Sequence, residues 1–177
     1  MNSFFQAEWL ALEQQRSQLI RQIGQLADDV YRRKPSDQTW SLAEVLAHLI
    51  TVEKLSLTYM KKKALDWFGN DHSGLWSQVR LLVFVLSQRL PLKFKAPQVI
   101  QQNTPSAMPL QETLAAWDTV RNDMKDFLSS IPEEHLKKFI YRHPQVGRFN
   151  GRQALVVLRE HFNHHLPQIN SLLKNCS

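Results

Sequence analysis

Two histidines near the end of the chain, His161 and His165, have a spacing suited to metal binding. Residues four apart on a helix project from one face, one turn apart. Histidine pairs at this spacing bind transition metals inside helical bundles. The pair interrupts an otherwise apolar stripe, with steps of four and three, formed by Ala154, Leu158, His161, His165, Gln168 and Leu172. Burying each imidazole unpaired would cost about 1–3 kcal/mol, so this stripe predicts a metal or hydrogen-bond partner. The alternative is an ordinary histidine pair on a solvent-exposed face.

His48 is the candidate for a third metal ligand. It lies one turn from Val45 and Val52, at the edge of an apolar stripe on an earlier predicted helix. Taken alone, this position is equally compatible with a core histidine whose ring nitrogens are satisfied by hydrogen bonds.

Helical periodicity predicts the elements that position these histidines. A first helix is expected over 3–33, ending before Pro35, because a residue that precedes proline avoids helical geometry. Ser41 and Glu44 form the pattern of a capping box, which predicts a second helix that begins there and continues to about Lys62. Three later helices are expected over 75–90, 110–131 and 151–174, although a strand remains an alternative for 81–86. Loops are expected over 66–74, 91–109 and 132–150, where glycine, proline and asparagine gather.

Composition supports a single helical domain. The 177 residues are 43% hydrophobic and 21% charged, which excludes a disordered chain. The 25 leucines outnumber the 18 valines and isoleucines, a balance that favours helices over sheets. We predict one all-α domain over residues 1–177. It is a four-helix bundle with an additional helix and a long loop between the second and third bundle helices.

Charge and the ends of the chain bear on location and partners. The net charge of +6 could favour an anionic partner, but the clusters 32–34 and 61–63 fall at predicted helix C-termini, where cations suit the helix dipole. The single cysteine, Cys176, cannot form an internal disulfide. No signal peptide or membrane-spanning segment is apparent, so we expect a cytoplasmic protein that binds neither nucleic acid nor membrane.

Two short segments resemble the signatures of the DinB/YfiT-like metalloenzyme superfamily. Residues 40–49, with the sequence WSLAEVLAHL, are similar to its W-S-x-x-E-x-x-x-H-L pattern. Residues 161–169, with the sequence HFNHHLPQI, resemble its H-x-x-x-H pattern followed by Q-I. His143, Pro144 and Gly147 also fit the pattern that precedes the last helix. The order and separation of these motifs make the resemblance specific, and it covers nearly the whole chain.

The resemblance implies a bundle in which His48, His161 and His165 hold one divalent metal. Three imidazoles leave a coordination position open, as in catalytic sites, and they suit zinc or nickel better than calcium or magnesium. Similar proteins are often homodimers. Those with known activities include thiol-dependent S-transferases, while many are described only as metal-dependent hydrolases.

Residues near the candidate ligands have separate interpretations. Gln168 shares the ligand face and is expected either to hydrogen-bond a ligand or to be a polar core residue. His164 lies about 100° from the ligand face, next to the ligands or on the surface. His143 lies in a loop whose position the sequence does not determine. Glu44 is accounted for by the capping box, and Pro167 is expected to kink the last helix.

We therefore predict a metal-dependent enzyme. Transfer of a thiol cosubstrate is preferred over hydrolysis, because no glutamate accompanies the histidine pair as in H-E-x-x-H hydrolases. The substrate is expected to be a small molecule, with a low-molecular-weight thiol as cosubstrate. Two rivals are a non-catalytic, metal-stabilised dimeric binding or regulatory protein and a basic nucleic-acid binder with structural histidines.

Overall fold

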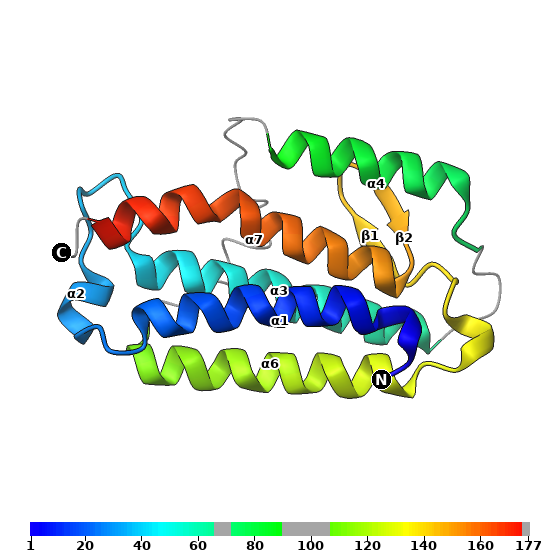
Figure 1. Ribbon diagram of the computed structural model, residues 1–177, viewed down its shortest axis with the longest axis horizontal. Coiled ribbons are helices and arrows are strands. Elements are labelled where there is room, and N and C mark those ends of the chain that lie inside the picture. Colours follow the sequence, from blue (N-terminus) through cyan, green and yellow to red (C-terminus); the bar gives the residue numbers. More distant parts are fainter. Residues whose placement is uncertain (66–71, 90–106, 175–177) are drawn as a thin grey trace.

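The computed structural model describes residues 1–65, 72–89 and 107–174 (Figure 1). In chain order, its helices and strands are α1 (Ser3–Ile23), α2 (Asp28–Arg32), α3 (Leu42–Ala64), α4 (Leu75–Gln88), α6 (Leu110–Ser130), the short 3-10 helix η1 (Glu133–His135), β1 (Tyr141–His143), β2 (Gly147–Phe149) and α7 (Gly151–Lys174). No helix in these ranges is both long and apolar enough to cross a membrane.

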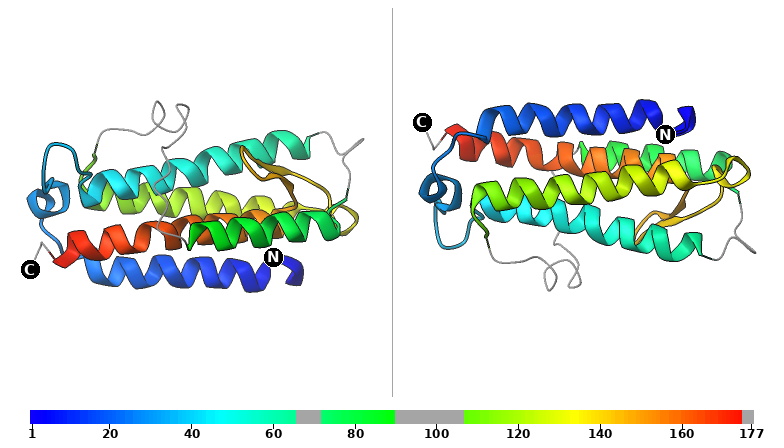
Figure 2. Two further views of the ribbon diagram at one scale, coloured as in Figure 1. Left: turned by 90° about the horizontal axis from the view of Figure 1, so that it is seen from above. Right: turned by 90° about the horizontal axis from the view of Figure 1, so that it is seen from below.

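Four long helices, α1, α3, α6 and α7, run alongside one another as a bundle (Figures 1 and 2). Helix α7 contacts α1 on one side and α3 on another, and α3 also contacts α6. Helix α4 packs on the outer side of α7, where it also contacts β2. The predicted all-α bundle with an additional helix between its second and third long helices is confirmed.

The first helix is shorter than the sequence indicated. A continuous helix over 3–33 was wrong, because α1 ends at Ile23 and Gly24 forms its C-cap. The chain then turns into the separate helix α2, whose Tyr31 is fully buried. The side chain of Asp28 accepts a hydrogen bond from the backbone N–H of Leu110 at 2.8 Å. The break therefore lets α2 satisfy a free donor at the start of α6, which has no side-chain cap of its own.

Helix α3, which carries His48, begins where the capping box predicted. The Ser41 side chain accepts a hydrogen bond from the backbone N–H of Glu44, and the Glu44 carboxylate accepts from the backbone N–H of Ser41 at 2.8 Å. Glu44 also forms an ion pair with Lys34. The structural interpretation of Glu44 is confirmed, and the lysines at 61–63 occupy the last turn of α3.

The segment 132–150, expected to be a loop, contains a small antiparallel hairpin. Tyr141 pairs with Phe149 and His143 pairs with Gly147. Gly147 has a φ of +98°, which favours glycine, and the Arg80 side chain packs closely against it. Three-residue strands are too short for a periodic signal, so the sequence pattern missed them.

Helices α4, α6 and α7 end within a few residues of the predicted positions. The strand alternative for 81–86 was wrong, because this segment is helical. Pro167 lies inside α7, which continues to Lys174. Most of the loops predicted over 66–74 and 91–109, and also Cys176, fall outside the described residues.

Part of the bundle interior is polar. Arg121 of α6 is 1% exposed and donates from Nη2 to Glu53 Oε1 of α3 at 2.6 Å and from Nη1 to Glu13 Oε1 of α1 at 2.7 Å. Trp117 donates from its indole nitrogen to Glu53 at 3.0 Å. This network joins three bundle helices beside the apolar core that supports the histidine site.

Candidate metal centre

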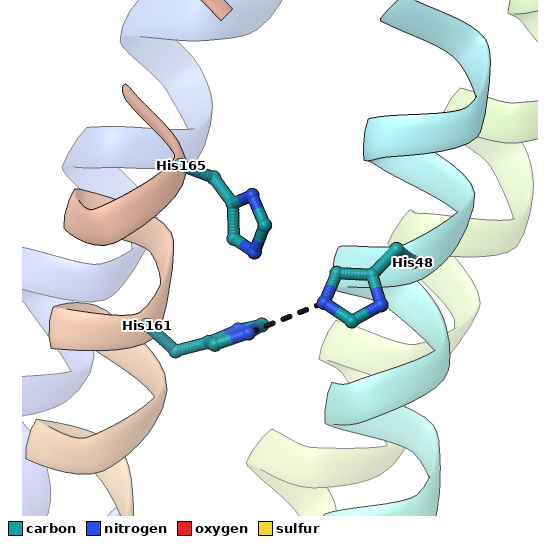
Figure 3. A group of neighbouring side chains, drawn as sticks. All are labelled: His48, His161 and His165. Carbon is teal, nitrogen blue, oxygen red and sulfur yellow. Dashed lines mark hydrogen bonds between the residues drawn. The ribbon is translucent and has the colours of Figure 1, made fainter. Parts of the chain in front are cut away.

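Three histidine rings from two helices converge on one point. His48 extends from α3, and His161 and His165 extend from α7, with their rings pointing toward one another (Figure 3). One nitrogen from each ring can be chosen so that all three lie within 4.8 Å of one another. The ring centroids are 4.9–5.1 Å apart. The structure thus brings together the three residues that the sequence singled out.

The local fold explains this convergence. His161 and His165 are one turn apart on α7, and Phe162 and Ile169 fix the rotation of that helix through their burial in the core. His48 is held in the same way, because Leu46 and Leu49 are buried on α3. The buried apolar neighbours therefore set the rotation of α3 and α7 about their axes. This rotation directs all three imidazoles toward the space between the two helices.

The spacing of two of these nitrogens fits a bound transition metal. His48 Nε2 and His161 Nε2 are 3.3 Å apart. Two nitrogens each bound at 2.0–2.1 Å to a tetrahedral zinc ion are separated by about 3.3–3.4 Å. The same distance allows a long hydrogen bond between the rings, so the distance fits the metal without requiring it.

Gln168 orients one of the three rings. Its Oε1 lies 3.0 Å from His165 Nδ1. A carbonyl oxygen accepts, so Nδ1 carries the proton and the Nε2 lone pair of His165 is free to bind a metal. Of the two interpretations of Gln168, the structure shows the hydrogen bond to a candidate ligand.

Burial favours the neutral, ligand-competent form of all three imidazoles. Burial, with a smaller effect of His165, lowers the pKa of His48 to about 4. Burial and then the charges of His165 and His48 lower the pKa of His161 well below its usual 6.5. Burial also lowers the pKa of His165, against the opposing effect of its hydrogen bond with Gln168. Three uncharged imidazoles at neutral pH form a donor set that suits zinc or nickel.

Acidic groups do not join this cluster in the described part of the chain. Glu44 is engaged in the capping box of α3, and Glu53 is bound by Arg121. Glu160, next to His161 in the chain, is buried and paired with Arg89 and Arg159 instead. The donor set is therefore made of imidazole alone.

Two further histidines lie near the cluster. The His164 ring is 5.5 Å from that of His165, and its Nδ1 lies 3.3 Å from the backbone oxygen of Gln88 on α4. His143 of β1 packs against Phe84 of α4 at 4.9 Å and contributes to the lowered pKa of His161. Helix α4 and the hairpin thus place both residues close to the candidate ligands.

Trp40 is a site residue whose role the sequence reasoning missed. Its ring centroid is 5.2 Å from that of His48, and 37% of the residue is exposed. Its presence in the W-S motif was the available signal, but the motif alone did not show that the indole contacts a candidate ligand.

Comparison with known proteins supports the family expected from the motifs. The model of the DinB superfamily matches residues 11–169, a range that contains all three histidines. The chain belongs to the DinB superfamily. The chain is also similar to the uncharacterized protein YuaE of Bacillus subtilis, with 24% identity over 149 residues that cover 83% of this chain and 85% of YuaE.

The fold of this chain is also seen in a solved structure, that of YfiT from Bacillus subtilis. The two structures align with a TM-score of 0.56 and 15% sequence identity, covering 96% of this chain and 86% of YfiT. YfiT is described as a probable metal-dependent hydrolase with an unusual four-helix bundle topology. The likeness shows that the two chains share a fold.

Proposed function

We propose that this DinB-superfamily chain is a metal-dependent enzyme whose single divalent ion is held by His48, His161 and His165. The observation that carries the proposal is the convergence of three neutral imidazoles on one point, with Gln168 orienting His165. A zinc or nickel ion in such a site supplies Lewis acidity, which favours the deprotonated form of a thiol or of water. With three protein ligands, a fourth position remains available to substrate.

The preferred reaction is transfer of a low-molecular-weight thiol to a small electrophile. In this reaction, a carbon–sulfur bond forms, the leaving group departs with its electron pair, and the thiol proton is released. The thiol must come from a cosubstrate, because the only cysteine of the chain, Cys176, belongs to no motif. The lack of a carboxylate in the described cluster favours this reaction, because sulfur is a strong nucleophile once deprotonated and needs no adjacent base.

His143 is the residue best suited to donate a hydrogen bond during the reaction. The backbone N–H of Gln145 donates to His143 Nδ1 at 3.3 Å, so the neutral ring carries its proton on Nε2. Burial lowers the pKa of His143 to about 4, which keeps the ring neutral at pH 7. The Nε2–H group could then stabilise a leaving group, while Trp40 provides an apolar surface beside His48.

Hydrolysis is the second candidate, favoured by the shared fold with YfiT and its description as a probable metal-dependent hydrolase. A third candidate is a non-catalytic, metal-stabilised binding protein. No feature of the described site favours it over the two enzymatic functions.

A substrate panel separates these functions. The zinc-loaded and nickel-loaded proteins would be assayed with several small thiols and electrophiles, and in parallel with simple esters and amides. We expect thiol-dependent turnover that His165→Ala reduces at least 100-fold and that His72→Ala, a change at an exposed histidine, leaves unaltered. Ester or amide turnover without a thiol would favour hydrolysis. Turnover that His165→Ala leaves unchanged would contradict a catalytic role for the metal.

A further inference from the structure

Helix α4 exposes an unusual number of large apolar side chains. Among the described residues, ten large apolar residues are exposed, and six of them lie on this one helix. They are Leu75 (79%), Trp76 (74%), Val79 (42%), Leu82 (59%), Val83 (55%) and Leu86 (56%). We call these six residues the α4 outer face. Isolated exposed apolar residues are ordinary on a protein surface, but a contiguous group marks an interaction site.

The outer face is opposite the side of α4 that packs on the bundle. At 100° per residue, its six members fall within a sector of about 120°. Phe84 and Ser77, which are 4% and 1% exposed, lie on the opposite side. Ser77 accepts a hydrogen bond from Gln153 of α7 at 3.1 Å, and Phe84 packs on His143. Helix α4 therefore already uses its other side to hold itself on the bundle, and its outer face has the composition of a second buried surface.

The spacing on the outer face favours a second copy of this chain as the occupant. Leu75, Val79, Leu82 and Leu86 follow one another at steps of four, three and four, the spacing of a helix–helix seam. This order of steps is the same in both directions along the helix. In an antiparallel pair, Leu75 would therefore face Leu86 of the partner subunit, and Val79 would face Leu82 of the partner subunit. Such a self-complementary arrangement is what a twofold axis requires.

Charge and area are compatible with this pairing. Arg80 is the only charged residue between 75 and 88, and its side chain is turned toward Gly147 of the hairpin, so no charge on the outer face opposes a second copy. At roughly 150–250 Å² for a large side chain, the exposed fractions amount to about 550–900 Å² per copy. A standard interface buries about 800 Å² on each partner, so this face supplies most of what a stable dimer needs. A membrane-surface helix would instead carry several lysines or arginines on its flanks.

We propose that the α4 outer face is a homodimer interface in which two α4 helices pair antiparallel about a twofold axis. Because the opposite side of α4 contacts His143 and His164, each α4 in the dimer would lie between the partner subunit and its own candidate metal centre. The inference concerns α4 and does not depend on the metal or on the reaction.

The test is the mass of the full-length protein in solution, measured by sedimentation equilibrium from 1 to 100 µM with and without 0.5 M NaCl. We expect twice the chain mass, insensitive to salt, for the wild-type protein and one chain mass for Leu82→Glu/Leu86→Glu. Leu10→Glu is the matched control, since Leu10 on α1 is 58% exposed. It should remain dimeric. Leu82→Ala/Leu86→Ala, which preserves helix propensity and adds no charge, should weaken the dimer at least tenfold, and circular dichroism would establish that each variant is folded.

Three results would overturn the proposal. A wild-type monomer over the whole range would show that the outer face does not pair two copies of this chain. A monomer that binds vesicles of phosphatidylcholine and phosphatidylglycerol would assign the face to a membrane surface. A dimer that survives Leu82→Glu/Leu86→Glu would place the interface elsewhere.

Discussion

Gln168 Oε1 lies 3.0 Å from Nδ1 of His165, one turn away on α7. The contact fixes the proton of His165 on Nδ1 and leaves Nε2 for the point on which His48 and His161 converge. A hydrogen bond of this kind from a neighbouring side chain holds the ring in one orientation and increases its basicity, which strengthens binding to a metal.

Removing this contact should weaken metal binding without abolishing it. We expect Gln168→Leu to lower zinc affinity by about 10–100-fold, the usual effect of losing such a partner. Gln168→Glu retains an oxygen acceptor and should stay within a few-fold of wild type. Competition with a chromogenic chelator would measure both, with the exposed Asn170→Leu as the control on the same helix. Equal affinities for Gln168→Leu and wild type would show that the hydrogen bond does not act on the ligand.

The buried Glu53–Arg121 ion pair should contribute strongly to the free energy of unfolding. Arg121 is 1% exposed, and burial opposes its charge, but the attraction of Glu53 and Glu13 outweighs this effect and raises its pKa. We expect Arg121→Met to reduce the free energy of unfolding by about 3–5 kcal/mol, because it leaves the buried Glu53 carboxylate without a cation. Glu53→Gln should reduce it less, because Arg121 keeps its ion pair with Glu13. The double variant Arg121→Met/Glu53→Gln should lose less free energy of unfolding than the two single variants lose together.

Urea denaturation would measure these differences. Arg33→Ala is the comparison, because it breaks the exposed Arg33–Asp29 pair, in which the side chains are 63% and 73% exposed. Such exposed pairs contribute about 0–1 kcal/mol. Similar losses for Arg121→Met and Arg33→Ala would contradict the importance assigned to the buried network.

Acidification should destabilise the metal-free protein over a defined range. The pKa of His48 is about 4 when folded and near 6.5 when unfolded, so between these values the unfolded chain binds the proton more readily. The free energy of unfolding should therefore fall as the pH drops from 6.5 to 4. The contribution of His48 is about 3 kcal/mol, and no further loss from this residue is expected below pH 4.

Unfolding of the chelator-treated protein at a series of pH values tests this expectation. The difference between wild type and His48→Leu isolates the histidine from carboxylates that titrate in the same range. A difference that is constant between pH 7 and 4 would show that His48 titrates normally in the folded protein.

The sequence predicted the long helices well because each carries a repeated signal. The cap of α3 at Ser41 and the apolar stripes of α3, α6 and α7 each contain several residues that point to the same structure. The break after α1 lacked such a signal, because it depends on Asp28 binding the start of α6, 82 residues later in the chain. The buried Glu53–Arg121 pair was missed for the same reason: nothing near Glu53 in the sequence indicates its partner.

The grouping of the three candidate ligands could be predicted from the sequence, but the residues around them could not. The spacing of His161 and His165 together with the motif around His48 was enough to identify three residues that the fold brings together. The positions of His143 and Trp40 depend on the hairpin and on the turn before α3, which short-range patterns do not determine. The sequence also could not predict that the apolar stripe of α4 faces outward, because helical spacing alone does not show which side of a helix packs on the bundle.

The metal content of the purified, untagged protein tests the central claim most directly. After reconstitution with zinc or nickel and removal of excess metal, elemental analysis should give about one ion per chain. His48→Ala and His161→Ala should each bring this value close to zero, and His72→Ala should leave it unchanged. Negligible metal in the wild-type protein, or full metal content in both His48→Ala and His161→Ala, would contradict the account.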